Sequence, residues 1–266
     1  MNILDNIVSK KWHEVARNKV LHPIKRLEAS LYFNSEVISL TRTLSQLGCS
    51  GVIAEFKRRS PSKGSINSCA TVRKTTKGYI DAGASALSVL TDRSFFGGCD
   101  EDLQEARRDQ FCPILRKDFI VDEYQVVEAR AIGADAILLI AAILSKDEVK
   151  RFAGLASSLG MEVILEIHTR KELDHLVPDI DVVGVNNRNL KTFVTDVRQS
   201  MELLPFIPSG VMKVSESGIS TPGIATALKD AGFDGFLIGE QFMKHAEPEQ
   251  ACASFISILK QMMYAD

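Results

Sequence analysis

Paired cysteines are missing from this 266-residue sequence, because its five cysteines are scattered and form no C-x-x-C motif. This spacing argues against a zinc knuckle, a thioredoxin-like redox motif and a framework of disulfides. The cysteines are Cys49, Cys69, Cys99, Cys112 and Cys252. We expect them to be free thiols in a reducing compartment, the cytoplasm.

Metal and nucleotide motifs are also missing. The histidines stand alone, with neither H-x-H nor H-E-x-x-H spacing, and no G-x-G-x-x-G follows an apolar run. They are His13, His22, His168, His175 and His245. The sequence therefore predicts no metal site and no bound cofactor.

Long apolar runs and an excess of one charge are absent as well. The longest apolar run, residues 136–144, is about half of what a membrane-spanning helix needs. The N-terminus lacks the order of a secretion signal. Because 32 basic residues nearly balance 34 acidic ones, no global field favours nucleic acid or an anionic membrane surface. We expect a small-molecule partner, with no nucleic acid and no membrane.

Short apolar or β-branched runs alternate with segments of helical period from residue 51 onward. This alternation is typical of parallel strands joined by crossover helices. The eight predicted strands are residues 51–57, 86–92, 113–118, 136–141, 162–167, 182–187, 211–217 and 235–239. Helices are predicted near 71–83, 100–109, 123–133, 146–159, 170–177, 196–204, 220–230 and 249–262.

Eight strand–helix units favour an α/β fold of the (β/α)8 TIM barrel type, since an open doubly wound sheet usually has fewer. We place the catalytic barrel at residues 49–266. Residues 1–48 are expected to be a helical extension packed on the barrel. Its basic residues are predicted to lie on a solvated helix face: Lys10, Lys11, Arg17, Lys19, Lys25 and Arg26.

Glu55 and Lys57 end the first predicted strand, and alternation along a strand puts them on the same face. Charges on a buried face must pair or serve chemistry. The alternative is a surface ion pair on an exposed strand. Because active sites of such barrels lie at the C-terminal ends of the strands, we expect both residues to belong to a site.

Other predicted strands also end in polar residues. Lys117 precedes Asp118, which leaves a surface pair between them as an alternative. Glu166 stands among apolar neighbours, which predicts a raised pKa suited to a general acid or base. Asn186 and Arg188 share a face and suit a carboxylate or phosphate, whereas the intervening Asn187 points away. The last two strands end in S-E-S-G and I-G-E, which favours a phosphate site there.

Taken together, these motifs resemble those of the indole-3-glycerol-phosphate synthase family. The resemblance covers the whole chain and rests on the order and spacing of six segments. They are residues 53–64 (IAEFKRRSPSKG), 114–120 (ILRKDFI), 165–167 (LEI), 184–190 (GVNNRNL), 215–219 (SESGI) and 236–239 (FLIG). It implies a carbon–carbon lyase of tryptophan biosynthesis. Such an enzyme converts 1-(2-carboxyphenylamino)-1-deoxyribulose 5-phosphate to indole-3-glycerol phosphate, carbon dioxide and water.

The resemblance also implies roles for individual residues. Lys117 would be the general acid of ring closure, and Glu166 would transfer protons. Lys57 would bind the substrate or act as the acid of dehydration, with Glu55 as its partner or a second proton-transfer group. The residues implied in substrate binding are Ser60, Pro61, Phe119, Asn186, Arg188 and Glu216. Those implied in phosphate binding are Ser217, Gly218, Gly239 and Glu240.

One residue departs from the pattern of the family, since Glu240 occupies a place beside the phosphate where serine is common. If only its backbone N–H is used, its side chain can point away; otherwise the affinity for phosphate suffers. The residues alone leave two alternatives open. One is another sugar-phosphate isomerase or lyase barrel, and the other is a barrel that binds a phosphorylated metabolite without catalysis. We expect a monomer.

Overall fold

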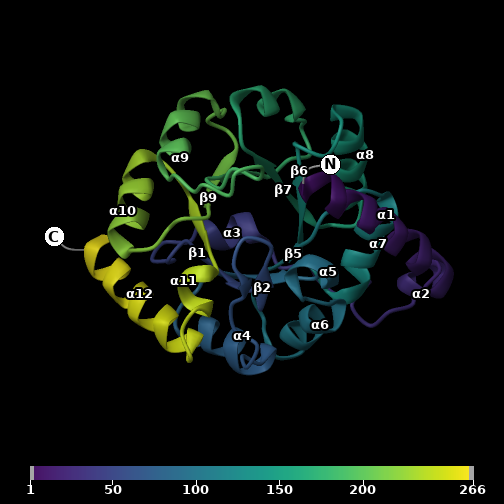
Figure 1. Ribbon diagram of the computed structural model, residues 1–266, viewed down its shortest axis with the longest axis horizontal. Coiled ribbons are helices and arrows are strands. Elements are labelled where there is room, and N and C mark those ends of the chain that lie inside the picture. The colour runs from purple at the N-terminus through teal and green to yellow at the C-terminus, as the bar shows by residue number, and fades with distance from the viewer. Residues whose placement is uncertain (1–2, 264–266) are drawn as a thin grey trace.

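Eight parallel strands close into a barrel in the computed structural model, which describes residues 3–263, so the predicted TIM-barrel fold is confirmed. Around the barrel the order is β1, β10, β9, β8, β7, β6, β5, β4 and back to β1 (Figure 1). The strands are β1 Val52–Phe56, β4 Ala86–Leu90, β5 Ile114–Lys117, β6 Ala136–Ile140, β7 Glu162–Ile167, β8 Val182–Asn186, β9 Met212–Glu216 and β10 Gly235–Ile238. All eight predicted strands are present, several with shorter ends.

Helices cover the outside of the barrel, as the alternating pattern predicts (Figure 1). They are α4 Val72–Asp81, α6 Asp100–Asp109, α7 Glu123–Ile132, α8 Lys146–Ser158, α9 Arg198–Leu203, α10 Pro222–Ala231 and α12 Pro248–Met263. The helix predicted at 170–177 is instead a 3-10 helix, η1 Arg170–His175. A second 3-10 turn, η2 Leu204–Phe206, follows α9, with a proline in its first turn. No helix in the described part of the chain is long and apolar enough to cross a membrane.

Four short elements in the loops after the strands escape the sequence patterns. They are the antiparallel strands β2 Arg59–Ser60 and β3 Gly64–Ser65, and the one-turn helices α5 Arg93–Phe96 and α11 Glu240–Met243. Each is too short to show a hydrophobic period. All four lie at the C-terminal ends of barrel strands, where the predicted site lies.

Alternation along the strands divides the core into two layers. Inward side chains such as Ile53, Leu115 and Ile164 fill the barrel interior. Outward side chains such as Val52 and Val163 pack against the surrounding helices. Both faces of the barrel sheet are buried, so the strands consist largely of consecutive apolar residues. A charged residue within a strand therefore indicates a functional or structural role.

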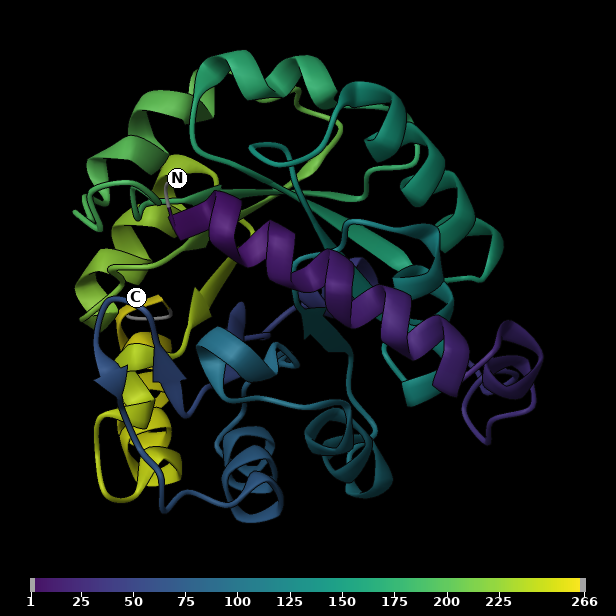
Figure 2. The same ribbon diagram turned by 45° about the vertical axis from the view of Figure 1, so that its right-hand side comes forward.

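The residues before β1 hold the barrel at both ends. The helix α1 Ile3–Leu21 runs across the front of the barrel in Figure 2, and α2 Ile24–Glu28 packs against α7. At the opposite end, α3 Leu40–Leu44 packs on the inner core. Its backbone N–H groups at Leu40 and Thr41 donate to the Glu162 carboxylate at the start of β7, over 2.6 and 3.0 Å. These two hydrogen bonds satisfy two of the backbone N–H groups that the start of a helix leaves without a partner.

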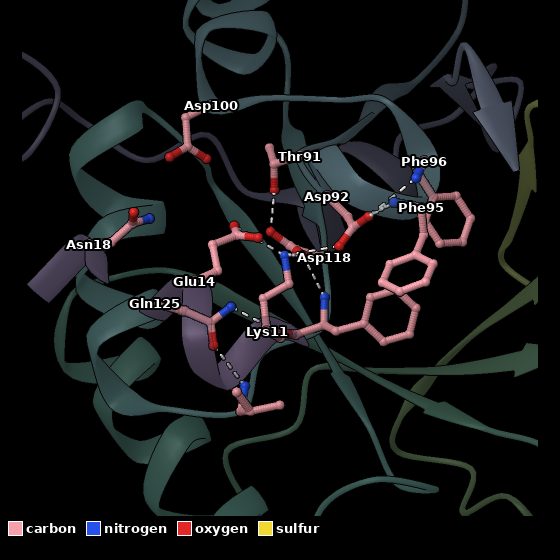
Figure 3. Close-up of polar contacts among 12 residues, drawn as sticks. Lys11, Glu14, Asn18, Thr91, Asp92, Phe95, Phe96, Asp100, Asp118 and Gln125 are labelled. Carbon is pink, nitrogen blue, oxygen red and sulfur yellow. Dashed lines mark hydrogen bonds and ion pairs between the residues drawn. The ribbon is translucent and has the colours of Figure 1, made fainter. Parts of the chain in front are cut away.

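Lys11 is buried, so its predicted place on a solvated helix face is wrong, whereas the other five basic residues named with it are exposed. Its Nζ atom lies 2.9 Å from Asp118 Oδ1 and 3.1 Å from Asp92 Oδ2 (Figure 3). Asp118 directly follows β5, and Asp92 lies two residues beyond the end of β4. The ammonium therefore joins α1 to two strand ends, and it relies on carboxylates far away in the sequence.

Asp118 makes no surface pair with Lys117. It is buried and accepts hydrogen bonds from Thr91 Oγ1 at 2.6 Å and from the Phe119 N–H at 2.8 Å. Burial raises the pKa of its carboxyl, but Lys11 and Arg116 more than offset this, and the net pKa lies below the ordinary value. An ionised Asp118 thus anchors the backbone next to Lys117.

Lys11→Met should lower the free energy of unfolding by about 3–5 kcal/mol, because Asp92 would then be buried without its cation and Asp118 would keep only Arg116. Chemical denaturation of both proteins measures the difference. Lys10→Met is the matched control, since Lys10 is exposed on the same helix, and its change should stay within about 0.5 kcal/mol. Equal midpoints for the two variants would contradict the buried network.

Candidate active site

A cavity of about 520 Å³ opens at the C-terminal ends of the strands. All of the residues predicted for catalysis, substrate binding and phosphate binding line it. Apolar residues that the motifs do not reveal complete the wall, among them Leu138 and Ile140 of β6 and Ile7 of α1. Within residues 3–263, no group of three His, Cys, Asp or Glu side chains is placed to hold a metal ion. The cavity therefore combines an apolar side for a ring with a polar side for charged groups.

Glu55 and Lys57 pair inside this cavity. Their side chains are 4% and 13% exposed, which excludes a surface ion pair. Lys57 Nζ donates to Glu55 Oε1 over 2.5 Å, while Ser88 Oγ donates to Glu55 Oε2 over 3.4 Å. Glycine is required opposite, because a Cβ atom at Gly239 would collide with the Glu55 carboxylate. The pair thus lies against the end of β10.

Lys117 is the cation at the centre of the site. Its Nζ lies 2.8 Å from Glu166 Oε2 and 3.1 Å from Glu216 Oε2, so β5, β7 and β9 meet at one ammonium. Burial alone lowers the pKa of Lys117, but Glu166, Glu216 and Glu55 raise it, and the net pKa lies well above its ordinary value. The ammonium is therefore protonated throughout the neutral range.

The pKa of Glu166 is lowered, so the predicted increase is wrong. Burial raises it, as its apolar neighbours suggest, but the charges of Lys117 and His168 outweigh burial. Lys117 comes from β5, far away in the sequence, whereas His168 lies only two residues beyond Glu166, where its spacing predicted only an isolated histidine. Glu166 is consequently ionised at neutral pH.

Glu216 is the carboxyl whose pKa rises, to about 7. Burial is the largest cause, Lys117 opposes it, and the negative charge of Glu166 supports it. Among the described residues, no hydrogen-bond partner reaches its Oε1 atom, and a Cβ at Gly184 would collide with that atom. The resemblance implied only a binding role for Glu216, since its pKa depends on residues of two other strands.

His168 is a second residue whose position the sequence did not reveal, since its spacing predicted only an isolated histidine. It directly follows β7 and its side chain is 10% exposed. Its Nε2 atom lies 3.4 Å from Glu166 Oε1. The imidazole therefore faces the oxygen of Glu166 that does not contact Lys117.

Asn186 and Arg188 both reach the cavity, whereas Asn187 points away, as alternation predicts. Asn187 donates to Ser215 Oγ and to the Ser217 carbonyl, each over 3.0 Å. Arg188 donates to Ser62 Oγ at 3.0 Å and to Glu240 Oε2 at 2.9 Å. The carboxylate of Glu240 therefore turns toward Arg188, and whether it points away from a bound phosphate stays a prediction.

The predicted phosphate-binding residues form one edge of the cavity. Ser217 and Gly218 have φ angles of 69° and 79°, the left-handed region that serine rarely adopts. A Cβ at Gly218 would collide with Thr195. This turn presents backbone to the cavity without side chains in between, which is the geometry that close approach of an anion requires.

Comparisons with known proteins identify the family of the chain. The sequence model of the family described as "Indole-3-glycerol phosphate synthase" matches residues 4–255. A protein of that name from Bacteroides thetaiotaomicron is 46% identical over 259 residues, which cover 97% of this chain and 99% of the relative. Another, from Chromobacterium violaceum, is 42% identical over 254 residues, 94% of this chain and 96% of the relative.

Solved structures support the fold alone. The tryptophan synthase subunit alpha of Legionella pneumophila superposes with a TM-score of 0.60 at 14% identity, covering 85% of this chain and 98% of that one. The match to the family model and the similar relatives identify the family in addition to the fold. The chain belongs to the indole-3-glycerol phosphate synthase family, as its motifs predict, and the predicted class of decarboxylating lyase in tryptophan biosynthesis is confirmed with it.

Proposed function

We propose that this chain closes the indole ring of 1-(2-carboxyphenylamino)-1-deoxyribulose 5-phosphate, with Lys117 as the general acid. The observation that carries the proposal is the buried ammonium of Lys117, held between Glu166 and Glu216 in a partly apolar cavity. Attack of the aromatic carbon on the ketone builds negative charge on oxygen. A cation already in place stabilises that charge without reorganisation of solvent.

The two carboxyl groups beside Lys117 divide acid and base functions between them. Glu166 has a lowered pKa and is ionised, whereas Glu216, with a pKa of about 7, holds a proton for much of the time. Environments that push two pKa values apart are how one site provides both functions. Glu166 accepts protons in this scheme, and a protonated Glu216 donates a hydrogen bond to a substrate oxygen.

Lys57 and Glu55 serve the dehydration that follows decarboxylation. That step requires a proton for the departing hydroxyl and removal of another from the ring system. Lys57 is the second cation of the cavity bound to a carboxylate, and Glu55 orients it. Lys57 also holds the substrate while Lys117 completes the earlier step.

Two neighbouring groups of cavity residues bind the charged ends of the substrate in this scheme. Arg188 and Asn186 offer a planar cation and an amide to the carboxylate. Ser60, Pro61 and Phe119 line the space in between. The left-handed turn at Ser217 and Gly218, together with the backbone at Gly239 and Glu240, holds the phosphate.

The two alternatives explain fewer of these features. A sugar-phosphate isomerase or a non-catalytic binding barrel accounts for the phosphate edge. Neither accounts for two lysines that are each paired with buried carboxylates. A phosphorylated small molecule is thus the partner we propose. In this proposal the chain works as a monomer in the cytoplasm, where cysteines remain free thiols.

Formation of indole-3-glycerol phosphate tests the function directly. The purified protein is mixed with the carboxyphenylamino-deoxyribulose phosphate, and the fluorescence of the indole product is followed. We expect turnover without an added metal or cofactor. A folded protein that leaves this substrate unchanged would contradict the proposal.

Lys117→Ala should reduce kcat by about 10²–10⁴-fold, the range of general acid–base catalysis, and leave substrate binding largely intact. Turnover is measured by product fluorescence, and binding by titration of the inactive variant with substrate. Lys150→Ala, at an exposed position of α8, should match the wild type. If binding weakened as much as turnover, Lys117 would be an anchor and not the acid.

Glu166→Gln should slow turnover by about a hundredfold and change the acid side of the pH profile. The pKa of Glu166 is lowered, so the wild type loses activity only as the pH falls through that depressed value. Glutamine cannot titrate, and this acid limb should disappear from kcat of the variant. Unchanged kinetics at every pH would remove Glu166 from the mechanism.

Glu240→Gln should lower KM by about threefold or more and leave kcat unchanged, because a carboxylate near the bound phosphate costs about 1 kcal/mol. Burial raises the pKa of Glu240, but Arg188 and Lys63 lower it by more than burial raises it. The net pKa lies below the ordinary value, so the carboxylate is charged at neutral pH. Glu247→Gln, at a side chain that is 64% exposed, is the control. A KM that rises in Glu240→Gln would mean that the glutamate assists binding.

A further inference from the structure

The carboxylate of Glu166 bridges two cations through different oxygens. Its Oε2 atom lies 2.8 Å from Lys117 Nζ, and its Oε1 atom lies 3.4 Å from His168 Nε2. A carboxylate in this arrangement can accept a proton from one partner and, by turning about its terminal bond, present that proton to the other. Lys117, Glu166 and His168 therefore form a continuous line of exchangeable groups that starts in the catalytic cavity.

The line continues beyond His168. Its Nδ1 atom lies 3.7 Å from Glu172 Oε2 of η1. Within the described chain, neither ring nitrogen of His168 has a hydrogen bond, although both are buried. Buried polar atoms without a partner are rare in proteins and call for an explanation. Here the imidazole stands between two acceptors, close to both, and a small ring movement would let it bond to either.

A second cavity, of about 930 Å³, lies on the far side of His168. His168 and Glu172 line it, together with Trp12 and His13 of α1 and Lys191 after β8. The last three are exposed, so the cavity reaches the surface. At roughly 30 Å³ for each water molecule, it has ample room for solvent. His168 thus separates the buried carboxylate of Glu166 from the second cavity.

The reaction itself needs such a route, provided that the proposed function holds. The carboxylate of the substrate leaves as neutral carbon dioxide. Ring closure takes up one proton at the carbonyl oxygen, dehydration takes up one at the departing hydroxyl, and one is returned from the ring system. Each turnover therefore consumes one proton from solvent, while the substrate fills the cavity above Lys117.

We propose that His168 is a positioning residue that acts through Glu166 and brings this proton from the second cavity to Lys117. When Lys117 has given its proton to the substrate, the imidazolium of His168 gives its Nε2 proton to the ionised Glu166 at Oε1. The protonated carboxyl group of Glu166 then turns about its terminal bond and passes that proton to Lys117 Nζ. The neutral ring of His168 keeps its proton on Nδ1, turns toward the second cavity, takes a proton from water at Nε2 and turns back. One proton enters and every group returns to its starting state.

The charges around His168 support this role. Burial lowers its pKa, but Glu172 and Glu166, with a smaller contribution from Glu216, raise the net pKa above the ordinary value. An imidazolium is therefore available near neutral pH. On the side of the second cavity, the groups that titrate or carry charge are Asp5 and His13 of α1 and Lys191.

Two substitutions test the proposal. His168→Asn should lower kcat at neutral pH by about tenfold and leave KM unchanged, since His168 does not touch the substrate. His168→Ala should lose as much, and added imidazole should restore its kcat by occupying the space of the missing ring. The removed ring makes no hydrogen bond, so both variants should fold, which thermal unfolding checks. His175→Asn, a half-buried histidine of η1, is the control.

The pH profile provides a readout that a purely structural residue would not change. Proton delivery needs the imidazolium, so kcat of the wild type should fall as the pH rises through the pKa of His168, which lies above the ordinary value of a histidine. In His168→Asn that ionisation should vanish, leaving only Glu216 to titrate near neutral pH. An unchanged kcat, or a uniform loss at all pH values without rescue by imidazole, would overturn the proposal. Loss of product in the wild type would instead refute the proposed function.

Discussion

The ammonium of Lys117, buried between two carboxylates, is the interaction on which the site depends. Three strands contribute one charge each, so no part of the cluster can move without leaving another charge buried and unpaired. The same cluster separates the pKa values of Glu166 and Glu216, although both are glutamates at strand ends. Two like carboxyls close to one cation cannot share it equally, and the difference provides a base and an acid.

A second buried cation supports the first. Lys11 pairs with Asp118, the residue that directly follows Lys117, and with Asp92 at the end of the neighbouring strand (Figure 3). Gln125 holds the backbone just beyond through the Phe119 carbonyl and the Val121 N–H. The segment after β5 is thus fixed from α1 on one side and from α7 on the other. Strain-free placement of a catalytic lysine requires such support from residues that never meet the substrate.

The sequence predicts what depends on local order. Two-residue spacing correctly placed Glu55 with Lys57 and turned Asn187 away from Asn186 and Arg188, because alternation is a property of every strand. The eight strand–helix units likewise followed from periodicity. Lys11, by contrast, was expected on a solvated face, since its partners lie some eighty and one hundred residues away along the chain. Local pattern cannot show which distant carboxylate closes over a helix.

Electrostatics is where local reasoning failed most clearly, and the reason is general. Apolar neighbours in β7 predicted a raised pKa for Glu166, and burial does act in that direction. The sign is decided by Lys117 and His168, which approach its two oxygens from opposite sides. The direction of a pKa shift is therefore a property of the assembled barrel. The same cations make Glu166 a connection between the catalytic cavity and solvent, which no single motif encodes.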